Sequence, residues 1–210
     1  MQHIHVLTLA ATCALALAVD LSVISRQDSQ SGKPGVPSYV ESGKCPEVEL
    51  QENFSHQKYA GKWYMGYKMD NPFLGDIEKC IQSDYQLDGT GFKVTTSGTS
   101  KNYKNTEVKG EIRSTQEFPD ASMSVLFPDS FPANYRVIDT DYTSYSCVYS
   151  CTTTNNFKSE FGFVFSRSAG GADRAWAKCG MPFLRNKINF AKLKPTDMSC
   201  FSGSRYYKWA

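Results

Sequence analysis

Cysteine and histidine are the residue types in this chain that could support redox, metal or nucleophilic chemistry. The sequence holds seven cysteines and three histidines. One cysteine and two histidines lie within residues 1–18, which read as a secretory signal peptide. The mature chain would keep one histidine, His56, and six cysteines: Cys45, Cys80, Cys147, Cys151, Cys179 and Cys200. One histidine cannot form a histidine metal cluster or a haem ligand pair, and a Ser-His-Asp triad would have to use His56.

An even number of cysteines in a secreted chain indicates disulfides rather than catalytic thiols. Sequence alone leaves their pairing open. With all of them paired, no thiolate is left for nucleophilic catalysis. His56 has polar neighbours at the entry to a strand and is expected at the surface. An enzyme is therefore the least favoured class of function, and no metal site is expected.

The N-terminal part of the chain reads as a leader and a tail. Residues 1–18 contain no Lys, Arg, Asp or Glu, end in Ala16-Leu17-Ala18, and include an apolar run too short to span a membrane. A lone membrane anchor is the alternative. Residues 19–44 are predicted to be a flexible segment, with order beginning near Cys45. Residues 45–210 are predicted to form one domain.

The charge of the chain excludes some classes of partner. Net charge is +2 at pH 7, and there is no run of basic residues. Neither a nucleic-acid surface nor a charged membrane patch is therefore indicated. The 12 tyrosines and 13 phenylalanines suit β-strands and also a lined cavity.

Short segments with strand propensity, separated by turn signals, follow from residue 61 onwards. The predicted strands are residues 61–68, 80–87, 92–97, 106–114, 122–127, 134–139, 144–153 and 158–166. Residues 172–184 look helical, and residues 188–194 could add a ninth short strand. Eight strands joined mostly by short turns predict an all-β, up-and-down antiparallel barrel followed by one helix.

Three motifs, in this order, resemble the signature stretches of the lipocalin family: Gly61 and Trp63 as G-x-W, Thr140-Asp141-Tyr142, and Phe165-Ser166-Arg167. The resemblance covers about residues 45–200 and implies an eight-stranded lipocalin barrel with the C-terminal helix packed outside. It also implies that Trp63 sits at the closed end with Arg167 across its ring. A cation–π contact of this kind is worth about 1–2 kcal/mol when shielded from water. These residues are then structural rather than ligand contacts.

Longer strings resemble the crustacyanins, the carotenoid-binding lipocalins of crustacean shell, and within them the A-type subunit class. They include the segments around Cys45 and Cys80, residues 145–151 and residues 158–168. The resemblance implies three disulfides: Cys45–Cys151, Cys80–Cys200 and Cys147–Cys179. It also implies a carotenoid ligand such as astaxanthin, a role in shell colour, and pairing with a second crustacyanin subunit type.

Strand parity then selects the side chains that would face the interior of the barrel. Because Cys147 and Cys151 would be tied to elements outside the barrel, the even-numbered residues 144–150 are expected to point inward. With Trp63 inward, residues 65 and 67 follow it. Elsewhere the apolar phase is the guide. The candidate cavity-lining set is Met65, Tyr67, Tyr85, Phe92, Val94, Val108, Ile112, Val125, Phe127, Ser146 and Val148. Ordinary barrel core explains each of them equally well.

Two carrier functions stay open beside the disfavoured enzyme. One is a carotenoid carrier, whose ligand would protrude from a mouth flanked by the apolar residues 71–74 and 127–128. The other is a carrier of a different small hydrophobic ligand: a fatty acid, sterol, retinoid or bilin. Separately, Asn53-Phe54-Ser55 is the only N-glycosylation sequon in the sequence, which makes Asn53 a candidate for modification.

Overall fold

The computed structural model describes residues 37, 39–115, 121–128, 130 and 132–201. The chain divides into two compact units, Met1–Pro37 and Ser38–Ala210, and the barrel lies within the second. The predicted signal peptide, residues 1–18, and most of the predicted flexible segment, residues 19–44, lie outside the described residues.

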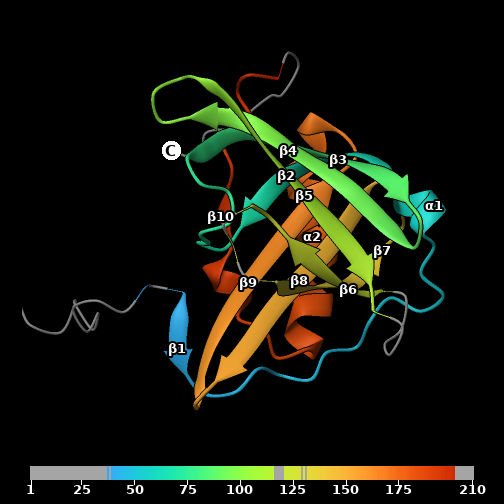
Figure 1. The fold of residues 1–210 in the computed structure, drawn as a ribbon, viewed down its shortest axis with the longest axis vertical. Coiled ribbons are helices and arrows are strands. Elements are labelled where there is room, and N and C mark those ends of the chain that lie inside the picture. Colours follow the sequence, from blue (N-terminus) through green and yellow to red (C-terminus); the bar gives the residue numbers. More distant parts are fainter. Residues whose placement is uncertain (1–36, 38, 116–120, 129, 131, 202–210) are drawn as a thin grey trace, which may run out of the picture. The chain divides into compact units, whose positions relative to one another are not determined.

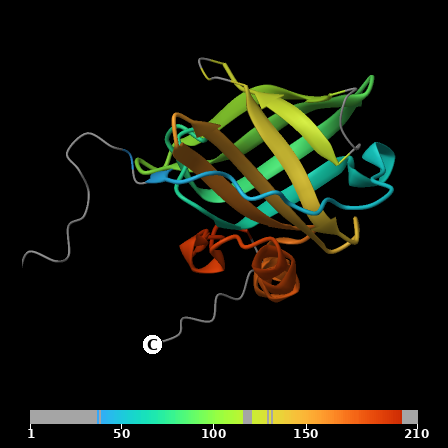
Figure 2. The same cartoon turned by 90° about the horizontal axis from the view of Figure 1, so that it is seen from below.

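Eight antiparallel strands close into a barrel (Figures 1 and 2). They are β2 Gly61–Lys68, β3 Ile77–Asp88, β4 Gly91–Ser100, β5 Asn105–Ser114, β6 Ser122–Leu126, β7 Ala133–Thr140, β8 Tyr145–Thr154 and β9 Phe157–Ser166. Each strand pairs with the next, and β9 pairs back with β2, which closes the barrel. The eight predicted strands are all present, and no predicted boundary is more than three residues away from the observed one.

Two α-helices of the described residues accompany the barrel. The short α1, His56–Tyr59, precedes β2, and the Ser55 hydroxyl accepts a hydrogen bond from the Lys58 amide at its start. The longer α2, Ala172–Arg185, lies against the outside of the barrel, as predicted (Figure 2). Gly66 allows this approach, because a Cβ atom at that position would lie 2.7 Å from the Cβ of Ala172.

The alternation of residues along β8 separates two apolar clusters. Val148 belongs to the cluster inside the barrel. Cys147, Tyr149 and Cys151 belong to a second cluster between the barrel wall and α2, which also contains Phe183. One strand therefore contributes to both cores, because successive side chains point to opposite faces. The predicted parity of β8 is confirmed for these residues.

Three disulfides attach peripheral segments to the barrel. The structure pairs Cys45 with Cys151, Cys80 with Cys200 and Cys147 with Cys179, which are the pairs that the resemblance implies. The first ties the N-terminal segment to β8, and the third ties α2 to the same strand. Both β8 cysteines point outward, as their partners require.

Two expectations about the ends of the barrel domain were wrong. Order does not begin near Cys45, because β1, Val40–Ser42, pairs with β9. The pairing of β9 with β2 covers only Phe163–Ser166, so the first residues of β9 have an edge free for β1. Residues 188–193 do not form a strand, and only Lys194 of the predicted ninth strand lies in one. A 3-10 turn, Phe190–Lys192, precedes the two-residue β10, Lys194–Pro195, because Ile188 and Leu193 both pack into the outer cluster.

Candidate ligand-binding site

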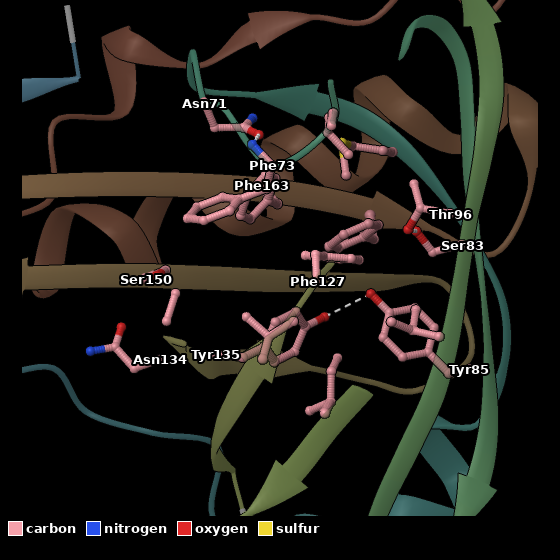
Figure 3. A pocket seen from close by; sticks show the side chains of 17 residues that line it. Asn71, Phe73, Ser83, Tyr85, Thr96, Phe127, Asn134, Tyr135, Ser150 and Phe163 are labelled. Atoms are coloured by element: carbon pink, nitrogen blue, oxygen red, sulfur yellow. Dashed lines mark hydrogen bonds between the residues drawn. The ribbon is translucent and has the colours of Figure 1, made fainter. Parts of the chain in front are cut away.

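A cavity of about 50 Å³ lies inside the barrel. Six of the predicted residues line it: Met65, Tyr85, Val94, Ile112, Val125 and Phe127. The other lining residues are Asn71, Phe73, Leu74, Ser83, Thr96, Ala133, Asn134, Tyr135, Ser150, Phe163 and Phe165 (Figure 3). None of these described residues carries a formal charge. The cavity is therefore apolar, with a few neutral hydroxyl and amide groups.

Tyrosine hydroxyls form a chain across the interior. The phenol oxygens of Tyr85 and Tyr135 lie 2.9 Å apart (Figure 3). Tyr135 also lies 3.0 Å from the phenol oxygen of Tyr59, which lies 2.9 Å from the Ser146 hydroxyl. A separate pair, Ser83 and Thr96, is joined at 2.8 Å. Buried polar groups are costly unless they are hydrogen-bonded, and this chain satisfies the three phenols where the barrel is otherwise apolar.

The three hydrogen-bonded phenols of Tyr59, Tyr85 and Tyr135 stay protonated at neutral pH. Burial raises the pKa of Tyr59 to about 12, although its bonds to Ser146 and Tyr135 act in the opposite direction. Burial also raises the pKa values of Tyr85 and Tyr135 well above the usual range of a phenol. The inner end of the cavity therefore presents neutral hydroxyls rather than a phenolate.

Ser150 stands apart from this satisfied network. Its side chain lines the cavity and is 4% exposed. Its hydroxyl has no hydrogen-bond partner within the described part of the chain. Figure 3 shows Ser150 and Asn134 on the opposite side of Tyr135 from Tyr85. A ligand oxygen at this position would satisfy the buried hydroxyl.

Tyr67 was expected to point into the barrel and does not. The register of β2 against β9 shifts between Met65 and Tyr67, so a β-bulge changes the parity after Met65. Tyr67 therefore faces outward, where its hydroxyl donates to Asp173 at 2.8 Å and its ring lies 5.8 Å from that of Trp176. Period-two parity cannot anticipate a bulge, because the extra residue leaves no mark in an apolar pattern.

Four other candidates do not line the cavity. Phe92 and Val148 are fully buried core of the barrel, and Val108 packs against that core. Ser146 points inward as predicted, but Tyr59 engages its hydroxyl. Their prediction as ligand contacts stays untested. Ser144 was also expected to point inward; it lies instead in the exposed turn before β8, where its hydroxyl donates to Asp141.

Several lining residues escaped the sequence analysis for identifiable reasons. Tyr135 lies on β7, a strand for which no inward residue was chosen. Asn71 lies in a loop, and its side chain bonds to the loop backbone at Met69 and Phe73. Phe163 and Phe165 alternate with Gly162 and Val164 along β9, and this period-two signal could have identified them.

Arg167 and Trp63 form the closed end of the barrel. The guanidinium carbon lies 3.7 Å from the centre of the Trp63 ring, and Trp63 is fully buried. The guanidinium donates to the backbone carbonyls of Lys58, Tyr59, Ala60, Lys62 and Tyr142. A Cβ atom at Gly61, where φ is +94°, would lie 3.5 Å from Nη1 of Arg167. Neither Arg167 nor Trp63 lines the cavity.

The Thr140-Asp141-Tyr142 motif builds the turn before β8. The Asp141 carboxylate accepts hydrogen bonds from the amides of Thr143, Ser144 and Tyr145. Burial acts to raise the pKa of Asp141, but these bonds and the Ser144 hydroxyl outweigh it and hold the pKa below its usual value. The Tyr142 hydroxyl accepts from the Ser55 amide at 3.1 Å, which connects this turn to α1.

His56 and Asn53 lie beside this closed end. His56 was expected at the surface, but it is half-buried, with its ring 5.2 Å from Phe54 and 5.5 Å from Phe92. Asn53 is exposed in the turn before α1, which leaves its amide accessible for modification. Within the described ranges, no group of three or more His, Cys, Asp or Glu residues is placed to hold a metal ion. No helix in the same ranges is long and apolar enough to cross a membrane.

The sequence profile of a lipocalin-like domain matches residues 54–194, and the closed barrel with one external helix is the architecture of that class. The chain belongs to the lipocalin family. It is similar to the crustacyanin-A1 subunit of Homarus gammarus, with 31% identity over 167 residues, 77% of this chain and 91% of that protein. The structure of lobster apocrustacyanin A1 superposes with a TM-score of 0.70 at 30% identity and covers 77% of this chain and 92% of the other. Apolipoprotein D of Mus musculus is 39% identical over 113 residues, 53% of this chain and 59% of that protein.

Proposed function

We propose that this protein is a secreted carrier of a long, uncharged apolar ligand, a carotenoid of the astaxanthin type, and contributes to shell colour as one subunit of a crustacyanin-like complex. The observation that carries the proposal is the cavity lining, which combines rings and aliphatic groups with neutral hydroxyls and no formal charge. A polyene with hydroxyl and keto groups on its end rings matches that lining. The similarity to crustacyanin-A1 supports the same ligand class.

The size of the cavity limits how such a ligand could enter. Sites for small molecules typically enclose about 300–1,000 Å³, whereas the cavity here is about 50 Å³. Binding therefore requires movement of lining side chains, and only one end of a carotenoid would fit within the barrel. The loops at residues 71–74 and 127–128 contribute two half-buried rings to the lining, Phe73 and Phe127. Ser150 contributes the hydroxyl that has no hydrogen-bond partner among the described residues.

The lining also ranks the alternative ligands. A fatty acid or a bilin carries carboxylates, and burying a carboxylate without a cationic partner is costly. A sterol or a retinoid alcohol has no such charge and remains the second candidate. Catalysis is not part of the proposal, because all six cysteines of the barrel domain are paired. Those disulfides and the predicted leader support secretion.

Two measurements test the proposal. The protein purified from its source should show a visible absorption band, and mass spectrometry of the extract should identify a carotenoid. Separately, Ser150→Leu should fill the cavity and weaken astaxanthin binding at least tenfold. The matched control is Ser144→Leu, the same exchange at an exposed residue in the turn before β8. It should leave binding unchanged. A colourless native protein that carries only a fatty acid, or equal effects of both exchanges, would refute it.

A further inference from the structure

The outward face of α2 carries apolar side chains where a solvent-facing helix usually carries charge. The helix buries Ala175, Cys179 and Phe183 against the barrel. With 3.6 residues per turn, the direction opposite to that buried face is occupied by Ala177, Met181 and Leu184. Met181 is 63% exposed and Leu184 is 59% exposed. Figure 2 shows α2 on the outside of the barrel, and the exposure of these two side chains places the strip on the solvent side of the helix.

A row of cations borders the strip on one side. Arg174, Lys178 and Arg185 are separated by four and seven residues, so they share one side of the helix. They are exposed, and none of them has an ion-pair partner within the described part of the chain. The one acidic residue of the helix, Asp173, accepts a hydrogen bond from the Tyr67 hydroxyl. The sequence shows no basic run because apolar residues separate these cations, and only the helix brings them together.

On the other side of the strip the helix presents Asp173 and Gly180, and Trp176 lies beyond them, next to the buried face. Trp176 is 38% exposed, and its ring lies 4.6 Å from that of Phe190 and 5.8 Å from that of Tyr67. The Cys147–Cys179 disulfide fixes the helix to β8. The face is therefore presented by a helix held in one orientation. Its apolar strip has a row of cations on one side, and Asp173, Gly180 and then Trp176 on the other.

We propose that this face of α2 docks on an anionic lipid surface. An exposed apolar strip bordered by long cationic side chains, on a helix that also carries a half-exposed tryptophan, is the composition of helices that lie in the membrane interface, where the cations reach the headgroups. A second copy of the chain fits less well, because it would bring the same three cations and one already engaged carboxylate. The docking does not depend on which ligand the barrel holds.

Cosedimentation with vesicles tests the docking. The folded protein should bind vesicles made of equal parts phosphatidylcholine and phosphatidylserine, bind pure phosphatidylcholine weakly, and lose binding as salt is raised. The triple exchange Arg174→Gln, Lys178→Gln and Arg185→Gln should weaken binding roughly a hundredfold. The double exchange Met181→Gln and Leu184→Gln should weaken it roughly tenfold.

Matched exchanges on other parts of the surface distinguish docking through this face of α2 from a general effect of net charge or of exposed apolar area. Lys93, Lys101 and Lys109 are exposed on the β4–β5 hairpin, and their joint exchange for Gln removes the same charge. Leu87 and Leu126, each 47% exposed on β3 and β6, provide the apolar control. Both controls should bind within twofold of the unaltered protein. The proposal is overturned if the unaltered protein does not bind the anionic vesicles, if the controls lose as much binding as the α2 variants, or if the α2 exchanges abolish self-association while vesicle binding persists.

Discussion

Tyr85 and Tyr135 reach each other across the interior of the barrel, with their phenol oxygens 2.9 Å apart. The contact joins β3 to β7, which are not neighbours in the sheet. Both side chains also line the cavity. A change at this contact should therefore affect both stability and the space open to a ligand.

Tyr135→Phe should destabilise the protein by about 1–3 kcal/mol, because it removes hydrogen bonds to Tyr59 and Tyr85 and leaves buried hydroxyls without a partner. Urea unfolding measures the loss. Tyr103→Phe, at a tyrosine that is 77% exposed, is the matched exchange and should change the free energy of unfolding by less than about 0.5 kcal/mol. Equal effects at both positions would contradict a stabilising role for the hydrogen bonds among the buried tyrosines.

Alkaline pH should destabilise the native barrel through the same phenols. Tyr59 has a pKa raised to about 12 by burial, whereas an unfolded tyrosine ionises near about pH 10. The unfolded state therefore binds fewer protons above about pH 10, and stability is present below that pH and lost as pH rises toward the folded pKa. Urea midpoints and tyrosinate absorbance should change together. Ionisation of the buried phenols near about pH 10 in a fully native protein would contradict this prediction.

Arg167→Ala should cost about 2–4 kcal/mol of stability, because the guanidinium is stacked on Trp63 and donates to backbone carbonyls of α1, β2 and the turn before β8. Arg167→Lys should recover little, since an ammonium cannot reproduce the planar fork. Lys62→Ala, at an exposed cation nearby, serves as the control. Ligand affinity of the folded variant should be unchanged, and a selective loss of affinity would assign Arg167 a direct role in binding.

Peptide mapping without reduction should recover Cys45–Cys151, Cys80–Cys200 and Cys147–Cys179 and no free thiol in the mature protein. Replacing Cys147 and Cys179 together by Ala should cost about 4 kcal/mol in the chain-entropy model, because the two cysteines are 32 residues apart. The other two pairs should form as before. A peptide joining Cys147 to Cys151 would contradict the outward orientation of both side chains.

Colour should depend on assembly more than on any single side chain. The small cavity leaves most of a carotenoid outside the barrel. A partner subunit that covers the protruding part would bind more tightly when the carotenoid is present. The refolded chain alone should bind astaxanthin weakly, and addition of a second crustacyanin subunit type should tighten binding and move the absorption band to longer wavelength. A full shift in the isolated chain would rule out a shared ligand.

Much of the barrel follows from local pattern. Alternation along residues 158–166 and the hairpin turn at residues 88–91 depend on neighbours within a few positions, so the strands were predictable nearly to their ends. Orientation of Cys147 and Cys151 was equally accessible, because a strand places residues four apart on one face. Family resemblance, rather than spacing, supplied the pairing of the cysteines.

The features that concern binding depended on contacts between residues distant in sequence. The bulge after Met65 turned Tyr67 outward, and no apolar pattern records an inserted residue. Only the folded structure distinguishes Ser150 from the other inward hydroxyls. The hydroxyls of Ser146 and Thr96 are hydrogen-bonded, whereas that of Ser150 has no partner among the described residues. Which faces of the strands and of α2 are apolar follows from the periodicity of the amino-acid sequence. Tertiary structure decided which side chains share the cavity and which cations share a helix face, because both depend on distances that close only when the chain has folded.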